Sequence, residues 1–104
     1  HMNNAKNAYR EKLEANLDKL QSDLQHMQAE MKEKKADAHI ALDKELEELN
    51  NRSDDLRRRL DETKPRGKAA MDEAMSGLAN AWDELKTGFH NARSQFNQAD
   101  RPQG

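Results

Sequence analysis

Large apolar residues recur along the chain at spacings that alternate between four and three, the pattern of a single apolar stripe on an α-helix. The stripe runs over residues 9–31 and, after a short polar interval with two lysines, resumes over residues 38–60. Neither Gly nor Pro occurs in residues 3–63. Because no local signal stops the helix, the pattern predicts one long amphipathic helix over residues 5–64.

The only strong break is the segment Thr63-Lys64-Pro65-Arg66-Gly67. Proline disfavours helical geometry at the residue before it and suits the first turn of a new helix. We therefore predict a turn here and a second helix over residues 65–98. Residues 1–4 are expected to be a tag-derived or disordered start, and the polar residues 99–104 a frayed tail.

The stripe residues are the candidate functional positions of this sequence, since we expect them to pack in a seam within or between chains. In the first helix they are Tyr9, Leu13, Leu17, Leu20, Leu24, Met27, Met31, Leu42, Leu46, Leu49, Leu56 and Leu60. In the second helix they are Met71, Met75, Leu78, Trp82, Leu85, Phe89 and Phe96.

An internal repeat of eleven residues lies in the second helix, where residues 75–85 align with residues 86–96. Gly77 matches Gly88 in this alignment. Eleven residues make about three helical turns, so equivalent positions return to nearly the same face. A helical glycine costs about 1 kcal/mol, and we interpret the two glycines as marks of a tight helix contact.

Two architectures fit this pattern. If the first helix is continuous it is about 85 Å long, and the second, at about 45 Å, covers only half of it. The stripe over residues 13–31 is then bare and predicts a homo-oligomer, most simply an antiparallel dimer. Substituting Leu20 and Leu24 with Asp should dissociate it.

The alternative is a monomeric three-helix bundle with a break near residues 34–37 and segments of similar length over 5–33, 37–63 and 67–97. Against it, residues 32–36 are good helix formers, and Asp37 is the only N-cap candidate in the interval. We favour the continuous helix, and so an all-α, oligomeric helical hairpin.

The amino-acid composition excludes several fold classes and kinds of chemistry. Charged residues make up 37% of the 104 residues and aromatics 4%, which is typical of solvent-exposed helices and excludes a β-sheet domain. The chain has no Cys, so thiolate catalysis and thiolate zinc sites are excluded. No apolar run is long enough to span a bilayer, and we expect a cytoplasmic protein.

Three groups of residues were considered as binding sites, but each is explained more simply as part of a helix surface. The run Arg57-Arg58-Arg59 lies among acidic residues without interleaved aromatics, which argues against nucleic-acid binding. His26 with Glu30 and His39 with Asp43 are i, i+4 pairs, but the residue set of a bundle metal site is missing. We therefore predict no enzyme activity, no cofactor and no metal.

The aromatic face of the second helix suggests an alternative role on a membrane or lipid surface. Trp82, Phe89 and Phe96 share this face. Residues 65–104, however, carry five basic and five acidic side chains, whereas membrane-binding helices usually have a basic balance. Packing within a bundle is the favoured interpretation of the stripe.

One segment resembles a known group. The long Lys/Glu-rich helix is followed by Ala81-Trp82-Asp83-Glu84-Leu85-Lys86-Thr87-Gly88-Phe89, then Ala92 and Phe96. This order resembles a group of small bacterial coiled-coil proteins, of which some cyanobacterial members are described as stress-responsive. The resemblance implies a helical, non-enzymatic protein. Together with the seam, it predicts a structural protein that associates with itself.

Overall fold

The structure is a computed structural model that describes the backbone of residues 2–34, 40–64 and 68–100, and the side chains of residues 8–33, 42–64 and 69–98. It contains the helices α1 (Met2–Lys34), α2 (Ile40–Thr63) and α3 (Lys68–Asp100). No strand occurs in these described parts. The expected all-α class is confirmed.

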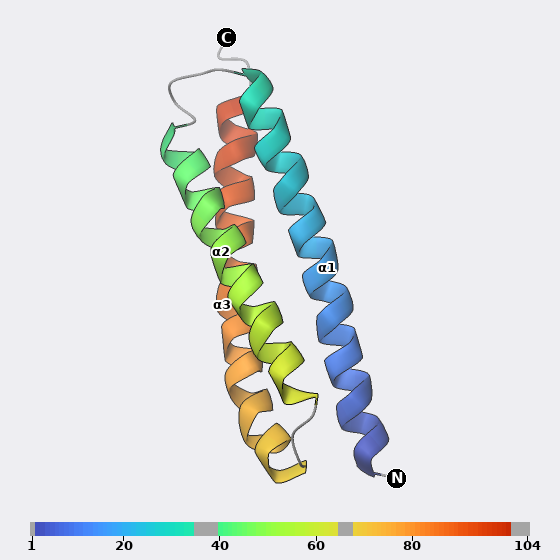
Figure 1. The fold of residues 1–104 in the computed structure, drawn as a ribbon. Coiled ribbons are helices and arrows are strands. Elements are labelled where there is room, and N and C mark those ends of the chain that lie inside the picture. Colours follow the sequence, from blue (N-terminus) through green and yellow to red (C-terminus); the bar gives the residue numbers. More distant parts are fainter. Residues whose placement is uncertain (1, 35–39, 65–67, 101–104) are drawn as a thin grey trace.

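The three helices lie side by side as a bundle (Figure 1). The chain runs along α1, returns along α2 and runs forward again along α3, so α1 and α3 point in the same direction. The favoured continuous helix over residues 5–64 is therefore wrong for this structure, because α1 and α2 are separate antiparallel helices. The three-helix alternative is the arrangement observed, and its expected break at residues 34–37 falls largely within residues 35–39, outside the described residues.

The helix ends follow the sequence signals in part. α2 ends at Thr63, two residues before Pro65, and the Lys64 backbone N–H donates to the carbonyl of Asp61 at 3.2 Å. This placement agrees with the restriction that proline imposes on its predecessor. α1 begins at Met2, so residues 2–4 are helical rather than a disordered start. α3 extends to Asp100, past the expected end at residue 98.

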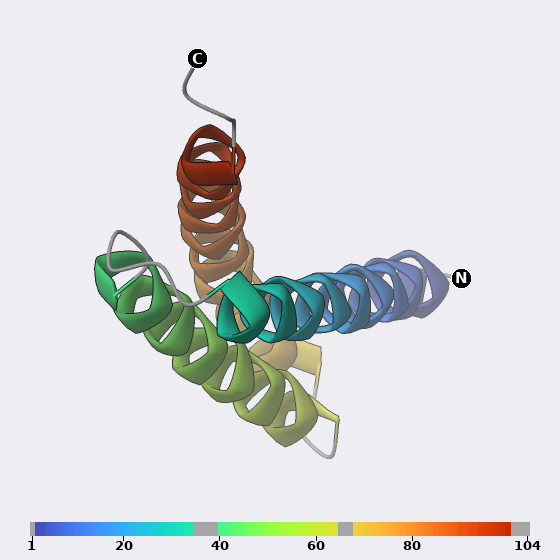
Figure 2. The same ribbon diagram turned by 90° about the horizontal axis from the view of Figure 1, so that it is seen from above.

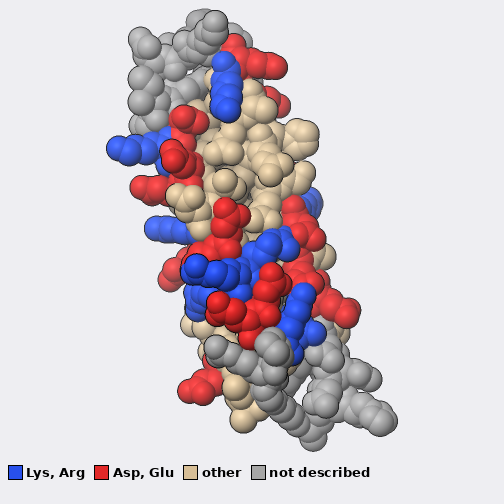
Figure 3. All heavy atoms as spheres, viewed as in Figure 1, with Lys and Arg blue, Asp and Glu red and all other residues tan. Residues whose placement is uncertain are grey.

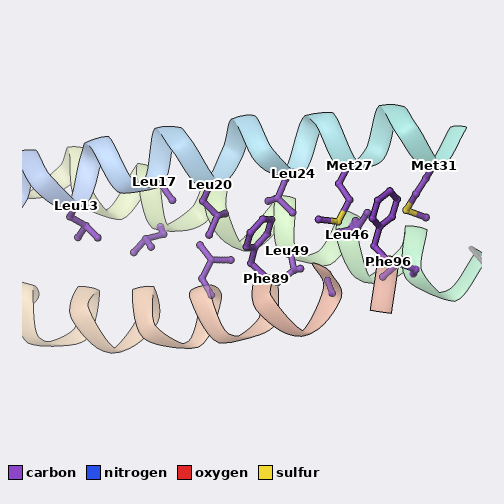
Figure 4. Close-up of a cluster of buried hydrophobic side chains, with 14 of the residues drawn as sticks. Leu13, Leu17, Leu20, Leu24, Met27, Met31, Leu46, Leu49, Phe89 and Phe96 are labelled. Carbon is purple, nitrogen blue, oxygen red and sulfur yellow. The ribbon is translucent and has the colours of Figure 1, made fainter. Parts of the chain in front are cut away.

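The core consists of one apolar stripe from each helix (Figure 4). Leu13, Leu17, Leu20, Leu24, Met27 and Met31 of α1 are all buried, and Phe89 and Phe96 of α3 point toward them. The stripe that was expected to be bare is therefore covered by α2 and α3 of its own chain. Because the fold supplies a third helical segment, an oligomer is not needed to bury it.

The helix pairs are not equally close. α2 packs most extensively against α3 and next against α1, whereas α1 and α3 contact each other least. Seen from above, the helices fan out, and the N-terminal end of α1 lies apart from the start of α3 (Figure 2). The side of the bundle between α1 and α3 is consequently its least closed side.

Candidate functional site

A groove lies between α1 and α3. Its apolar lining comes from Met27, Phe89 and Phe96, and its polar lining from Asp23, His26, Glu30, Arg93 and Asn97, around a volume of about 290 Å³. The α1 rim is acidic and the α3 rim carries an arginine. Arg93 occupies the repeat position that corresponds to Trp82, so an exposed cation replaces an aromatic side chain where the groove forms.

A polar network joins α1 to α2 at mid-bundle. Gln21 Nε2 donates to Ser53 Oγ and to Asp54 Oδ1, both at 3.1 Å, and Gln21 Oε1 accepts from Arg57 Nε at 3.0 Å. Arg57 also pairs with Asp18. Ser53 is fully buried in the α2 stripe, and its hydroxyl donates to the carbonyl of Asn50 at 2.9 Å. Since buried polar groups must be satisfied, this network favours one register of α1 against α2.

A second link between α1 and α2 lies at the end of α2. Lys64 Nζ is 3.3 Å from Glu14 Oε1 and 3.5 Å from Asp61 Oδ1. The hydrogen bond and charge of Glu14, followed by the charge of Asp61, raise the pKa of Lys64 above its ordinary 10.5. Lys64 is about half exposed, so solvent weakens the ion pair and its contribution to stability is small.

Two of the α2 arginines, Arg57 and Arg58, form ion pairs within the chain. Arg58 pairs with Asp55, and Arg52 and Arg59 line a groove of about 480 Å³ between α2 and α3 that also contains Glu84. On the face shown in Figure 3, Lys and Arg side chains lie among Asp and Glu side chains. On this face the two signs of charge are therefore interspersed, as on a solvated helix surface.

The two His–carboxylate pairs considered as metal ligands can be followed only in part. His26 and Glu30 both line the α1–α3 groove, but the described residues contain no group of three His, Cys, Asp or Glu side chains placed to hold a metal ion. His39 lies outside the described residues. In the part of the chain that is described, none of the helices has the length and apolar character needed to cross a membrane.

Most predicted seam residues are brought together in one core, and three are not fully covered. Tyr9 is 43% exposed, and Met75 and Trp82 are half-buried. Met75 and Trp82 precede Phe89 and Phe96 at seven-residue spacing on α3. Residues seven apart share a helix face, so this row becomes more exposed where α1 diverges from α3.

The residues of the polar network were not predicted from the sequence. Asp18, Gln21 and Arg57 flank the stripes and look like ordinary surface residues in a sequence. Ser53, the one polar residue within the leucine stripe of α2, was the available signal. This signal is incomplete, because the Ser53 hydroxyl donates to the Asn50 carbonyl of its own helix and so does not by itself identify a partner on α1.

Comparison with protein-family models, with curated proteins and with solved structures finds no match. The resemblance to small bacterial coiled-coil proteins therefore stays a prediction. The fold and the site define the class only as a three-helix bundle with an apolar core and a polar network between α1 and α2.

Proposed function

We propose that this chain is a non-enzymatic structural protein that acts by associating with a second copy of itself. The observation that supports the proposal is the incomplete closure between α1 and α3, where Met75 and Trp82 remain half-buried. Partial exposure of large apolar side chains on one side of a bundle favours further helix packing there. The earlier reason for self-association, a bare stripe on α1, no longer applies.

The proposal is tested by the mass of the protein in solution. Light scattering and sedimentation equilibrium should give a mass that rises from one chain to two as the concentration increases. A mass of one chain at every concentration up to the solubility limit would contradict the proposal. The stress-associated role rests on the resemblance alone and stays a prediction.

Binding to a lipid surface, the alternative function, has less support from the packing of α3 than from the sequence pattern. It requires the aromatic face of α3, but Phe89 and Phe96 are buried against α1 and only Trp82 is half-exposed. Binding would therefore have to open the bundle. Flotation with anionic vesicles, compared between the parent protein and Trp82→Ala, tests this alternative.

A further inference from the structure

The side of the bundle between α1 and α3 has an apolar half and a groove half. Along the bundle axis, Phe89 of α3 lies between Leu20 and Leu24 of α1 (Figure 4). α1 and α3 run in the same direction, so the half-buried Met75 and Trp82, fourteen and seven residues before Phe89, are level with the N-terminal half of α1. The α1–α3 groove, which Phe89 lines, lies beyond them. The partly exposed apolar side chains and the groove therefore follow one another along the same side.

The α1 rim of this side is basic toward its N-terminal end and acidic toward its C-terminal end. Asp23 and Glu30 line the groove. Lys12 and Lys19 are exposed and precede them by eleven residues, or about three helical turns, so they lie on the same face of α1. Among the described side chains, none of these four takes part in an ion pair. Such a rim is complementary to a second copy of itself that lies antiparallel to it.

One antiparallel register pairs all of these charges. Lys12 and Lys19 are seven residues apart, as are Asp23 and Glu30. If a two-fold axis passes beside residue 21 of α1, Lys19 lies opposite Asp23 of the second copy. The same axis places Lys12 opposite Glu30 of the second copy. Each pair then forms twice, because a two-fold interface uses the same surface on both copies.

The same register places the apolar half of each copy over the groove of the other. Trp82 is level with residues 13–17 of α1, and the axis carries that level to residues 25–29, where the groove lies. Arg93 is exposed on the α3 rim of the groove, four residues after Phe89. Arg93 of the second copy is therefore level with Trp82. A guanidinium that lies over an indole face is attracted to it.

The side is large enough for a specific contact, although its apolar area is small. The rod is 58 Å long and 18 to 20 Å across, and a standard interface buries about 800 Å² on each partner. Among the described residues, Tyr9 is the only large hydrophobic one that counts as exposed. Charge pairing therefore determines the register, and we expect the association to be weak and dependent on concentration.

From these observations we propose that two copies associate through their α1–α3 sides as an antiparallel two-fold dimer. In this dimer, Trp82 of each copy packs over the α1–α3 groove of the other. The basic end of each α1 rim faces the acidic end of the other. The interface closes at two copies, because both copies use the same surface. This inference rests on the proposed function and names its partner surface.

Charge reversal on the α1 rim tests the pairing. Lys19→Glu sets like charges against each other at Asp23 of the second copy and should raise the dimer dissociation constant at least about tenfold. Adding Asp23→Lys restores opposite charges in the same register and should return the constant to within about threefold of the parent value. Sedimentation equilibrium measures the constants, and circular dichroism confirms that each variant is folded.

Lys44→Glu is the matched control for this experiment. It makes the same change of charge on the exposed surface of α2, which lies away from the α1–α3 side, and should leave the dissociation constant unchanged. Equal effects of Lys19→Glu and Lys44→Glu would overturn the proposed register. Failure of Asp23→Lys to rescue Lys19→Glu would also overturn it.

The fluorescence of Trp82 reports the interface directly, because it is the only tryptophan of the chain. Its emission should move to shorter wavelength as the concentration rises, with the same midpoint as the mass, because the indole leaves water. A dimer with unchanged emission would overturn this interface and leave the proposed function standing. A monomer at every concentration would overturn both. If the emission of that monomer shifts only with anionic vesicles, the side binds lipid instead of a second copy.

A single cysteine tests the position of the two-fold axis. Lys86 is exposed on the α3 rim, seven residues before Arg93, and its charge is paired with Asp83 of its own helix at 3.8 Å. It lies close to the level of the axis, so Lys86→Cys should give a covalent dimer with a short bismaleimide. Lys44→Cys should give none, and the chain has no cysteine of its own. A native dimer that both variants capture equally, or neither captures, would overturn the arrangement.

Discussion

Gly88 and Gly77 hold equivalent places in the eleven-residue repeat, yet their surroundings differ. A Cβ added at Gly88 would lie 2.9 Å from Cδ2 of Leu49, a buried side chain of α2. At Gly77 the nearest atom is Arg59 Nη2 at 3.6 Å, an ordinary contact. The expectation of a tight helix contact is therefore confirmed for Gly88 and wrong for Gly77.

This difference gives the first prediction. Gly77→Ala should raise the free energy of unfolding by about 0.5 to 1 kcal/mol, because alanine is the better helix former. Gly88→Ala gains the same propensity but crowds Leu49, and overpacking typically costs about 1 to 3 kcal/mol. We expect Gly88→Ala to be about 1 to 2 kcal/mol less stable than Gly77→Ala in urea denaturation. Equal stabilities would contradict the close α2–α3 contact.

Lys64 provides a prediction about pH. Its pKa is raised mainly by its hydrogen bond to Glu14, so Glu14→Gln should lower this pKa toward 10.5. A raised pKa means that the ion pair stabilises the fold fully below the unfolded value of 10.5 and loses this effect as the pH rises through the folded value.

An NMR titration of the Lys64 side chain measures the shift. Glu11→Gln removes an exposed carboxylate on the same helix and serves as the control, with no change expected at Lys64. If the two variants move the pKa equally, the contact with Glu14 is not its cause.

For the helices as elements, the spacing of apolar residues correctly predicted which face of each helix is buried. It did not predict that α1 and α2 are separate helices. The buried stripes of all three helices were predicted from the spacing of Leu, Met and Phe. The break near residues 34–37 was only the less favoured alternative, because residues 32–36 favour helix and no turn residue marks them. Helix propensities are worth less than 1 kcal/mol per residue, so burial of the α1 stripe can outweigh them.

The prediction at this scale concerns Leu24, which is fully buried in α1 close to Phe89. Leu24→Ala should lower the free energy of unfolding by about 2 to 5 kcal/mol because it leaves a cavity in the core. Gln25→Ala, at the next and exposed position, should change it by less than about 0.5 kcal/mol. Thermal and chemical denaturation followed by circular dichroism measure both.

The same burial changes the expected result of the double substitution Leu20→Asp with Leu24→Asp. From the sequence, it was expected to dissociate an oligomer of folded helices. In the closed bundle both side chains belong to the core of a single chain, so two buried carboxylates should unfold the chain itself. Loss of the helical circular dichroism signal at all concentrations is the expected outcome. A folded monomer would contradict a shared core.

The whole molecule is a rod, with principal extents of 58 × 20 × 18 Å and a radius of gyration of 16.6 Å. A single helix over residues 2–63 would be about 90 Å long, at the rise of an α-helix. The closed bundle and the dimer of continuous helices expected from the sequence therefore differ in length as well as in mass.

Small-angle scattering should distinguish these forms. A dilute sample is expected to have a radius of gyration near 16.6 Å, and a concentrated sample in which two copies associate a larger value. If mass doubles without any increase in maximum dimension, the copies pack side by side.

By itself, the sequence determined the all-helical class, the turn near Pro65 and the side chains that need burial. These features follow from local spacing, from proline geometry and from the rarity of β-branched residues. Only the tertiary structure decided that α1 folds back on α2, that Ser53 and Gln21 meet, and that α1 and α3 diverge. These outcomes depend on which apolar surfaces cover one another. Contacts among all three helices decide this, and no single segment of the chain does.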